Sequence, residues 1–151
     1  MEGDSIWGSK DFQVPEYFNF ADVLDEWASK EKNGQREGDI PALWWVDGEG
    51  LEVKWNFQDL ASNSKRAANV LCTAANIKPG DRVMILVHRI PEYWLIQLAC
   101  LRTGATLVPA PANIGPSELH TRISACKPAC FVAGGGVIEN DLLNVIDKVT
   151  I

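Results

Sequence analysis

From Arg82 onward, three short apolar runs alternate with amphipathic stretches, and this pattern restricts the fold more than any other feature of the chain. The runs are RVMILV at 82–87, ATLV at 105–108 and ACFVA at 129–133. Strands that are almost continuously apolar are typical of parallel sheets buried on both faces. The stretches that follow each run have the spacing of helices. The sequence therefore predicts an α/β fold in which a β-α-β-α-β-α unit forms a parallel sheet between helices.

Proline and glycine mark the ends of the helices predicted within this unit. Pro91 and Pro116 suit the first turns of two helices, because the first backbone N–H groups of a helix have no partner within it and proline lacks that group. Gly104 suits the end of the first of these helices. A third helix is predicted over 137–149, with its apolar side formed by Leu142, Leu143, Val145, Ile146 and Val149.

Two asparagines mark predicted helix starts in the first half of the chain. Asn19 and Asn56 each precede an apolar helical stripe, and an Asn side chain in that position accepts a hydrogen bond from an unpaired backbone N–H group. Asp22 and Asp59 lie three residues further on, where a carboxylate can bind back to the start of the helix. The sequence therefore predicts a capping box at both starts.

A β-hairpin is predicted over 42–57, ALWWVDGEGLEVKWNF, with Asp47-Gly48 as its turn. Residues 1–18 are predicted to be an irregular arm. Its aromatic residues, Trp7, Phe12, Tyr17 and Phe18, indicate that the arm packs against another surface. The tryptophans of the hairpin and helices are interpreted as core residues: Trp27, Trp44, Trp45, Trp55 and Trp94.

Composition argues against several classes of function. The 151 residues have a formal net charge of −6 and scattered basic residues, so we expect neither a nucleic-acid surface nor an anionic-membrane surface. No apolar run is long enough to span a bilayer. The first residues, MEGDSIWGSKDF, have neither the pattern of a secretory signal nor the arginine-rich, acid-poor composition of a transit peptide.

The run AGGG at 133–136 lies between a predicted strand and a predicted helix, where many proteins bind phosphate. A P-loop needs a lysine and a hydroxyl residue after its glycines, but Val137, Ile138 and Glu139 follow here. The second half of the dinucleotide fingerprint GxGxxG is also missing. We therefore interpret the glycines as a strand-to-helix turn that needs positive φ.

The cysteines are Cys72, Cys100, Cys126 and Cys130. A zinc site at Cys126 and Cys130 would have His120 as the nearest histidine, but the sequence offers no second ligand pair. Buried reduced thiols are the simpler interpretation, because nothing in the sequence indicates an oxidising compartment. His88 and His120 are interpreted as loop or surface residues, since neither belongs to a catalytic motif.

Four segments together resemble one enzyme family. They are VPEYFNFADVLDEW from Val14, PALWWVDGEG from Pro41, KWNFQDLASNSKRAANVL from Lys54 and KPGDRVMILVHRIPEYWLIQLACLRTGATLVPAP from Lys78. GDRV followed by a helix and RTGATLVP is similar to a pattern found throughout the adenylate-forming acyl- and aryl-CoA synthetases. FNFADVLDEW and PALWW resemble more narrowly the N-terminal portion of the medium-chain acyl-CoA synthetases.

The resemblance implies the first subdomain of an adenylate-forming enzyme. Such enzymes are ligases: they join a carboxylic acid to AMP from ATP, release pyrophosphate, and then transfer the acyl group to CoA. The full-length family uses ATP, CoA and magnesium, and members like this one act on medium-chain or aryl carboxylic acids. The implied compartment is the mitochondrial matrix, with the cytosol as the alternative because no transit peptide is recognised.

The resemblance carries over one candidate binding residue. Family members often have a CoA-contacting Gln in the loop that matches PAPANIG, and the aligned residue here is Asn113, which keeps the amide. Its alternative role is that of a turn residue before Gly115-Pro116. Pro111, directly after Ala110, leaves open whether this loop follows the family's backbone path.

The family's phosphate loop, its magnesium and adenine motifs and its catalytic lysine match positions beyond Ile151. We therefore expect residues 19–151 to be a partial N-terminal domain of an AMP-dependent synthetase, which binds no cofactor productively and is inactive alone. The alternative is a non-catalytic binding or interaction module derived from such an enzyme.

Overall fold

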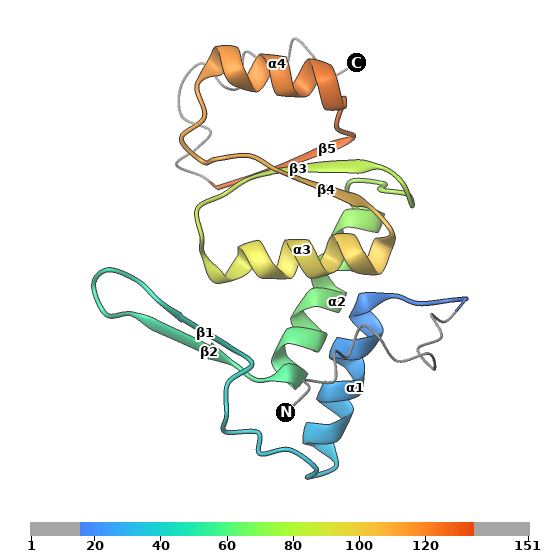
Figure 1. Ribbon diagram of the computed structural model, residues 1–151, viewed down its shortest axis with the longest axis vertical. Helices are drawn as coiled ribbons and strands as arrows, with labels where there is room; N and C mark the ends of the chain where they lie inside the picture. The colour runs from blue at the N-terminus through green and yellow to red at the C-terminus, as the bar shows by residue number, and fades with distance from the viewer. Residues whose placement is uncertain (1–15, 135–151) are drawn as a thin grey trace, which may run out of the picture.

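The computed structural model describes residues 16–134 (Figure 1). Its helices are α1 (Phe20–Lys32), α2 (Phe57–Thr73), α3 (Pro91–Thr103) and α4 (Pro116–Cys126), and its strands are β1 (Leu43–Val46), β2 (Glu52–Trp55), β3 (Arg82–Leu86), β4 (Thr106–Pro109) and β5 (Cys130–Ala133). The first 15 residues of the predicted arm, the end of the AGGG run and the helix predicted over 137–149 lie outside the described residues. None of the helices between Glu16 and Gly134 has the length and apolar composition that a membrane crossing requires.

The parallel sheet has the strand order β4-β3-β5, with β3 in the middle. Ile85 of β3 pairs with Pro109 of β4, and Leu86 pairs with Ala133 of β5, so the carboxyl ends of the three strands lie at one edge. In Figure 1, α3 lies on one face of this sheet and α4 lies on the other. The predicted α/β fold, with a hairpin followed by a covered parallel sheet, is confirmed in the part of the chain that the structure describes.

The two faces of β3 belong to two separate apolar clusters. Val83 packs with residues of α2 and α3, including Ala99. Met84 packs on the opposite face with Leu119 and Ile123 of α4. All five side chains are fully buried. Because successive strand residues point to opposite faces, burial of both faces explains why this strand is apolar from Val83 onward, after the exposed Arg82.

A polar network joins the three helices on the α3 side of the sheet. Arg102 of α3 donates two hydrogen bonds to the Asp25 carboxylate of α1, at 2.7 and 3.0 Å. It donates a third, at 2.9 Å, to Oγ of Ser64, which is buried in α2. The hydrogen bond from Arg102, and a weaker contribution from Lys65, hold the pKa of Asp25 below its ordinary value, although burial acts in the opposite direction. The network fixes α1 against α2 and α3.

The helix starts confirm one predicted capping box and correct the other. At α2, the Asn56 side chain accepts from the N–H of Asp59 at 2.8 Å, and the Asp59 carboxylate accepts from the N–H of Asn56 at 3.2 Å. At α1, Asn19 caps the helix by accepting from the N–H two residues on, and the predicted box with Asp22 is wrong. The Asn19 amide instead donates to the Leu101 carbonyl at 2.7 Å, which adds a tertiary contact that sequence spacing does not show.

The hairpin of β1 and β2 is confirmed, but its turn is longer than predicted. Residues 47–51 form a loop in place of a tight turn at Asp47-Gly48. One carboxylate oxygen of Asp47 accepts from the N–H groups of Glu49 and Leu51, at 2.8 and 2.7 Å. An aspartate that binds the backbone beyond it in this way can organise a wider loop.

Several aromatic residues predicted to be buried lie at the surface. Trp44 is 57% exposed because it lies on the outward face of β1, with Lys54 Nζ 4.2 Å from its ring centroid. Trp27 of α1 is 38% exposed. Tyr17 and Phe18 are also exposed, so these two residues of the predicted arm do not pack onto the described part of the chain. The half-buried tryptophans are Trp45, Trp55 and Trp94.

Candidate functional site

The parallel sheet leaves an opening where its strands end. From β3 the chain turns to α3 on one face, whereas from β4 it turns to α4 on the other face and returns past β3 to β5 (Figure 1). In open α/β sheets, ligands bind in the crevice that such a reversal leaves outside the carboxyl ends of the strands. A pocket of about 700 Å³ lies at the ends of β3 and β4.

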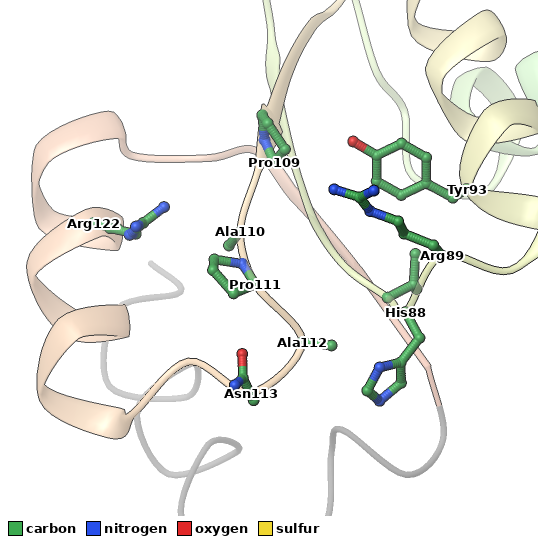
Figure 2. A pocket seen from close by; sticks show the side chains of 10 residues that line it. His88, Arg89, Tyr93, Pro109, Ala110, Pro111, Ala112, Asn113 and Arg122 are labelled. Carbon is green, nitrogen blue, oxygen red and sulfur yellow. The ribbon is translucent and has the colours of Figure 1, made fainter.

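Three parts of the chain form the walls of this pocket. Residues 87–89 follow β3, residues 109–113 include the end of β4 and the loop after it, and helices α3 and α4 contribute Tyr93 and Arg122. Figure 2 shows Arg89 and Arg122 on opposite sides of the loop that follows β4. The fold therefore brings together two arginines that lie 33 positions apart in the sequence.

The charged lining of the pocket is basic. Arg89 and Arg122 carry positive charge throughout the physiological pH range, and no aspartate or glutamate is among the described residues that line the pocket. Glu118, one helical turn before Arg122, binds its guanidinium at 2.7 and 3.1 Å and offsets part of its charge. The chain as a whole is acidic, and the pocket differs from it in this respect. The two arginines favour an anionic ligand, such as one that carries phosphate, because a guanidinium group binds phosphate oxygens through two parallel hydrogen bonds.

The loop after β4 is fixed at both ends. The N–H of Ala110 donates to the carbonyl of Ile85 at 2.9 Å, which continues the pairing of β4 with β3. The N–H of Ile114 donates to the carbonyl of Pro111 at 3.1 Å, and the Ile114 side chain is buried in the cluster beneath α4. These contacts give the loop a defined path past the pocket.

Asn113, the candidate binding residue of the sequence, lies at the pocket and is exposed. Its side chain forms no hydrogen bond with any other described residue, and Gly115 occupies the N-cap position of α4. The amide is therefore available to a ligand. Its contact with CoA stays a prediction.

Sequence reasoning missed the other polar residues of the pocket. Arg89 directly follows the apolar run of β3, a place where loop residues often meet ligands, and this signal was available in the sequence. Tyr93 and Arg122 gave no comparable signal, because their approach to the pocket depends on how α3 and α4 are placed. His88, interpreted as a loop residue, is exposed at the pocket, and His120 is exposed on α4, which confirms both interpretations.

The cysteines differ in their environments. Cys100 is buried, and burial, with a contribution from Cys130, raises the pKa of its thiol to about 11. Burial also raises the pKa of Cys130. Cys72 is exposed, so its predicted burial is wrong. Between Glu16 and Gly134, no group of three or more His, Cys, Asp or Glu side chains is arranged to hold a metal ion.

The sequence model of the AMP-binding enzyme family matches residues 30–150. This range includes β3, β4 and the whole lining of the pocket. The chain belongs to the AMP-binding enzyme family.

Acyl-coenzyme A synthetase ACSM3 of Rattus norvegicus is 46% identical to the chain over 121 residues, which are 80% of this chain and 21% of that protein. Acyl-coenzyme A synthetase ACSM4 of Homo sapiens is 47% identical over 141 residues, which are 91% of this chain and 24% of that protein. Both relatives are named as mitochondrial. The predicted resemblance to the medium-chain acyl-CoA synthetases is confirmed, and the chain spans less than a quarter of the length of these relatives.

Solved structures described as CoA ligases share the fold. A benzoate CoA ligase from Burkholderia xenovorans superimposes with a TM-score of 0.70 at 17% identity, over 89% of this chain and 25% of that one. A protein from Rhodopseudomonas palustris, described as a putative long-chain-fatty-acid CoA ligase, gives 0.71 at 23% identity, over 89% and 31%. At these identities the likeness shows the fold alone.

Proposed function

We propose that this chain is the N-terminal portion of a medium-chain acyl-CoA synthetase, in which the whole protein converts a carboxylic acid, ATP and CoA to acyl-CoA, AMP and pyrophosphate. The observation that carries this proposal is the identity of 46 to 50% with acyl-coenzyme A synthetases over 121 residues, 80% of this chain. Medium-chain or aryl acids are the proposed substrates, magnesium is the proposed metal, and the mitochondrial matrix is the proposed compartment.

The pocket at the ends of β3 and β4 is the proposed contribution of this region to CoA binding. CoA carries phosphate groups at one end, and the guanidinium groups of Arg89 and Arg122 match phosphate in charge and in hydrogen-bond geometry. The arm of CoA contains amide groups, and the Asn113 amide can both donate to and accept from such groups. In this assignment, Arg89 and Arg122 bind the phosphate groups of CoA, and Asn113 binds an amide group of its arm.

We further propose that the chain alone binds CoA weakly and forms no acyl-adenylate. The family model matches residues 30–150 of this chain. By resemblance, the groups that hold the ATP phosphates and the catalytic lysine lie after this region in members of the family. Without these groups, the developing charge on the phosphates would have no stabilising partner. The test is to incubate the pure chain with ATP, magnesium, CoA and hexanoate or benzoate, and to search for the thioester by mass spectrometry. Detectable acyl-CoA would overturn the proposed inactivity.

The role of Asn113 can be tested in an enzyme that turns over. Residues 30–150 would replace the matching part of rat acyl-coenzyme A synthetase ACSM3, and Asn113→Ala would be compared with Asn69→Ala, an exposed site on α2. We expect Asn113→Ala to raise the KM for CoA about tenfold with a smaller change in kcat. An active chimaera whose KM for CoA is unaffected by Asn113→Ala would contradict the assignment.

The second candidate is a non-catalytic module that associates with a synthetase. It is favoured by an apolar hollow of about 300 Å³ between α2, α3 and β5, lined in part by Val70, Leu95, Ile96 and Val132. Val70 is 60% exposed, and uncovered apolar surface of this kind often meets a partner. Sedimentation of the chain mixed with rat acyl-coenzyme A synthetase ACSM3 distinguishes the two candidates. Only a non-catalytic module is expected to sediment with the enzyme, and Val70→Glu should abolish this association.

A further inference from the structure

One hydrogen bond connects the hairpin to the pocket. The indole Nε1–H of Trp45, in β1, donates to the backbone carbonyl of Arg89 at 2.6 Å, across 44 positions of sequence. An indole N–H group can only donate, so the direction of this bond is fixed by chemistry. Trp45 is half-buried, whereas its neighbours Trp44 and Val46 are exposed, because alternate strand residues point to opposite faces.

The turn that receives this bond has few other constraints. Residues 88–90 belong to the connection from β3, which ends at Leu86, to α3, which begins at Pro91 and has no side-chain cap at Ile90. The backbone hydrogen bonds of the turn run from the N–H of Ile90 to the carbonyl of His88, at 2.8 Å, and from the N–H of Tyr93 to the carbonyl of Ile90, at 3.0 Å. In the part of the chain that the structure describes, Trp45 makes the one side-chain hydrogen bond to this turn.

The same turn carries Arg89 to the pocket. The backbone carbonyl of Arg89 accepts the hydrogen bond from Trp45, while the side chain of Arg89 lies on the pocket wall near Tyr93 (Figure 2). A side chain that must meet a charged group on a ligand depends on a backbone that stays in place. Loss of the Trp45 bond would therefore loosen the Arg89 guanidinium without removing any pocket residue.

We propose that Trp45 is a positioning residue of the pocket, which fixes the 88–90 turn and so presents Arg89 to an anionic ligand. Its use in catalysis rests on the proposed function, because that function supplies CoA as the ligand. The fixing of the turn can be measured without any ligand. The proposal gives the hairpin a role in the binding site, although it pairs with no strand of the parallel sheet.

Two variants at position 45 and one control test the proposal on the full 151-residue chain. Trp45→Phe removes the N–H donor, and replacement of Trp45 by benzothienylalanine removes the donor but keeps the bicyclic shape. Trp44→Phe is the control. This neighbouring tryptophan is 57% exposed, and its ring lies beside the Lys54 ammonium group and not against the 88–90 turn.

The readout is ¹⁵N relaxation of the backbone at 88–90 and of the Arg89 side-chain Nε. In both Trp45 variants we expect the backbone order parameters at 88–90 to fall from about 0.85 to below about 0.6, and the order parameter of Arg89 Nε to fall with them. Trp44→Phe should change neither. The thermal midpoint of the benzothienylalanine protein should fall only slightly, as the loss of one hydrogen bond predicts.

Three results would overturn the proposal. The first is an unchanged order parameter at 88–90 in the benzothienylalanine protein, and the second is an equal fall in Trp44→Phe. The third is a large fall in the thermal midpoint with order retained at the turn, since this marks a role in global stability. A separate titration with CoA tests the proposed function, and its failure would not alter the relaxation result.

Discussion

The parallel sheet and the hairpin are stabilised in different ways. Val83, Met84 and Ile85 at the centre of β3 have no exposed surface, whereas in the hairpin Trp44 and Val46 are more than half exposed. The sheet is held by burial on two faces, and the hairpin by its own backbone pairing and by single hydrogen bonds such as that from Trp45. The sheet thus determines where the pocket lies, while the hairpin adjusts one of its walls.

The largest expected effect is on the sheet. Leu119→Ala should lower the free energy of unfolding by about 2–5 kcal/mol, because Leu119 is fully buried beside Met84 and its loss leaves a cavity. Val46→Ala in the hairpin, 51% exposed, should cost less than about 0.5 kcal/mol. Urea unfolding of both variants measures the difference. Equal losses would mean that the two regions do not differ as described.

The next effect is on the polar network behind the sheet. Arg102→Met should cost about 2 kcal/mol at neutral pH, because it removes two bonds to Asp25 and one to buried Ser64. Arg66→Met, at an exposed arginine of α2, is the matched control and should change stability little. Urea unfolding of the two variants at pH 7 is the measurement.

The cost of Arg102→Met should also depend on pH. The pKa of Asp25 is lowered in the folded chain, so its stabilising contribution is complete above the unfolded value of about 3.9 and is lost as pH falls through the folded value. The gap in stability between the unmodified chain and the variant should therefore narrow in acid. A gap that stays constant from neutral pH into this acid range would contradict the assigned role of Asp25.

A smaller effect is expected where the hairpin meets α2. Asn56→Ala should cost about 1 kcal/mol, since it removes one half of the capping box with Asp59. Asn69→Ala, at an exposed site in the same helix, should be neutral or slightly stabilising, because alanine is the better helix former. Thermal unfolding distinguishes the two substitutions, and the opposite ranking would show that the box contributes nothing.

The mildest perturbation leaves the sequence unchanged. In the native chain, a thiol reagent at pH 8 should modify Cys72, which is exposed, well before Cys100, which is buried with a pKa of about 11. Addition of urea should open the sheet cluster and make Cys100 reactive. Mass spectrometry of the labelled peptides gives the order, and early modification of Cys100 would show that this cluster is loosely packed.

The sheet could be predicted from sequence because its signals are local. The run from Arg82 to Val87 is apolar on both faces, and Pro91 and Gly104 bracket the helix that follows. The exposure of Trp44 could not be predicted in the same way. A tryptophan in a strand is buried or exposed according to the face on which it lies, and a hairpin with several aromatic residues does not reveal which face meets the body.

The candidate site was predictable only in part. Asn113 was identified by resemblance, and it does lie at the pocket. Arg89 and Arg122 meet there because the connections after β3 and β4 leave on opposite faces, which is a property of the topology. The bond from Trp45 to Arg89 likewise joins residues 44 positions apart, and no periodicity or spacing in the sequence indicates it.

Titration of the ¹⁵N-labelled chain with CoA tests most directly whether this region contributes a CoA pocket to a synthetase. We expect progressive shifts of the amide signals of Arg89, Asn113 and Arg122, with a dissociation constant on the order of 1 mM because the chain supplies one wall of the full site. The variant Arg122→Met should weaken these shifts. Shifts that are absent at the pocket, or that fall on another surface, would contradict the assignment of this pocket to CoA.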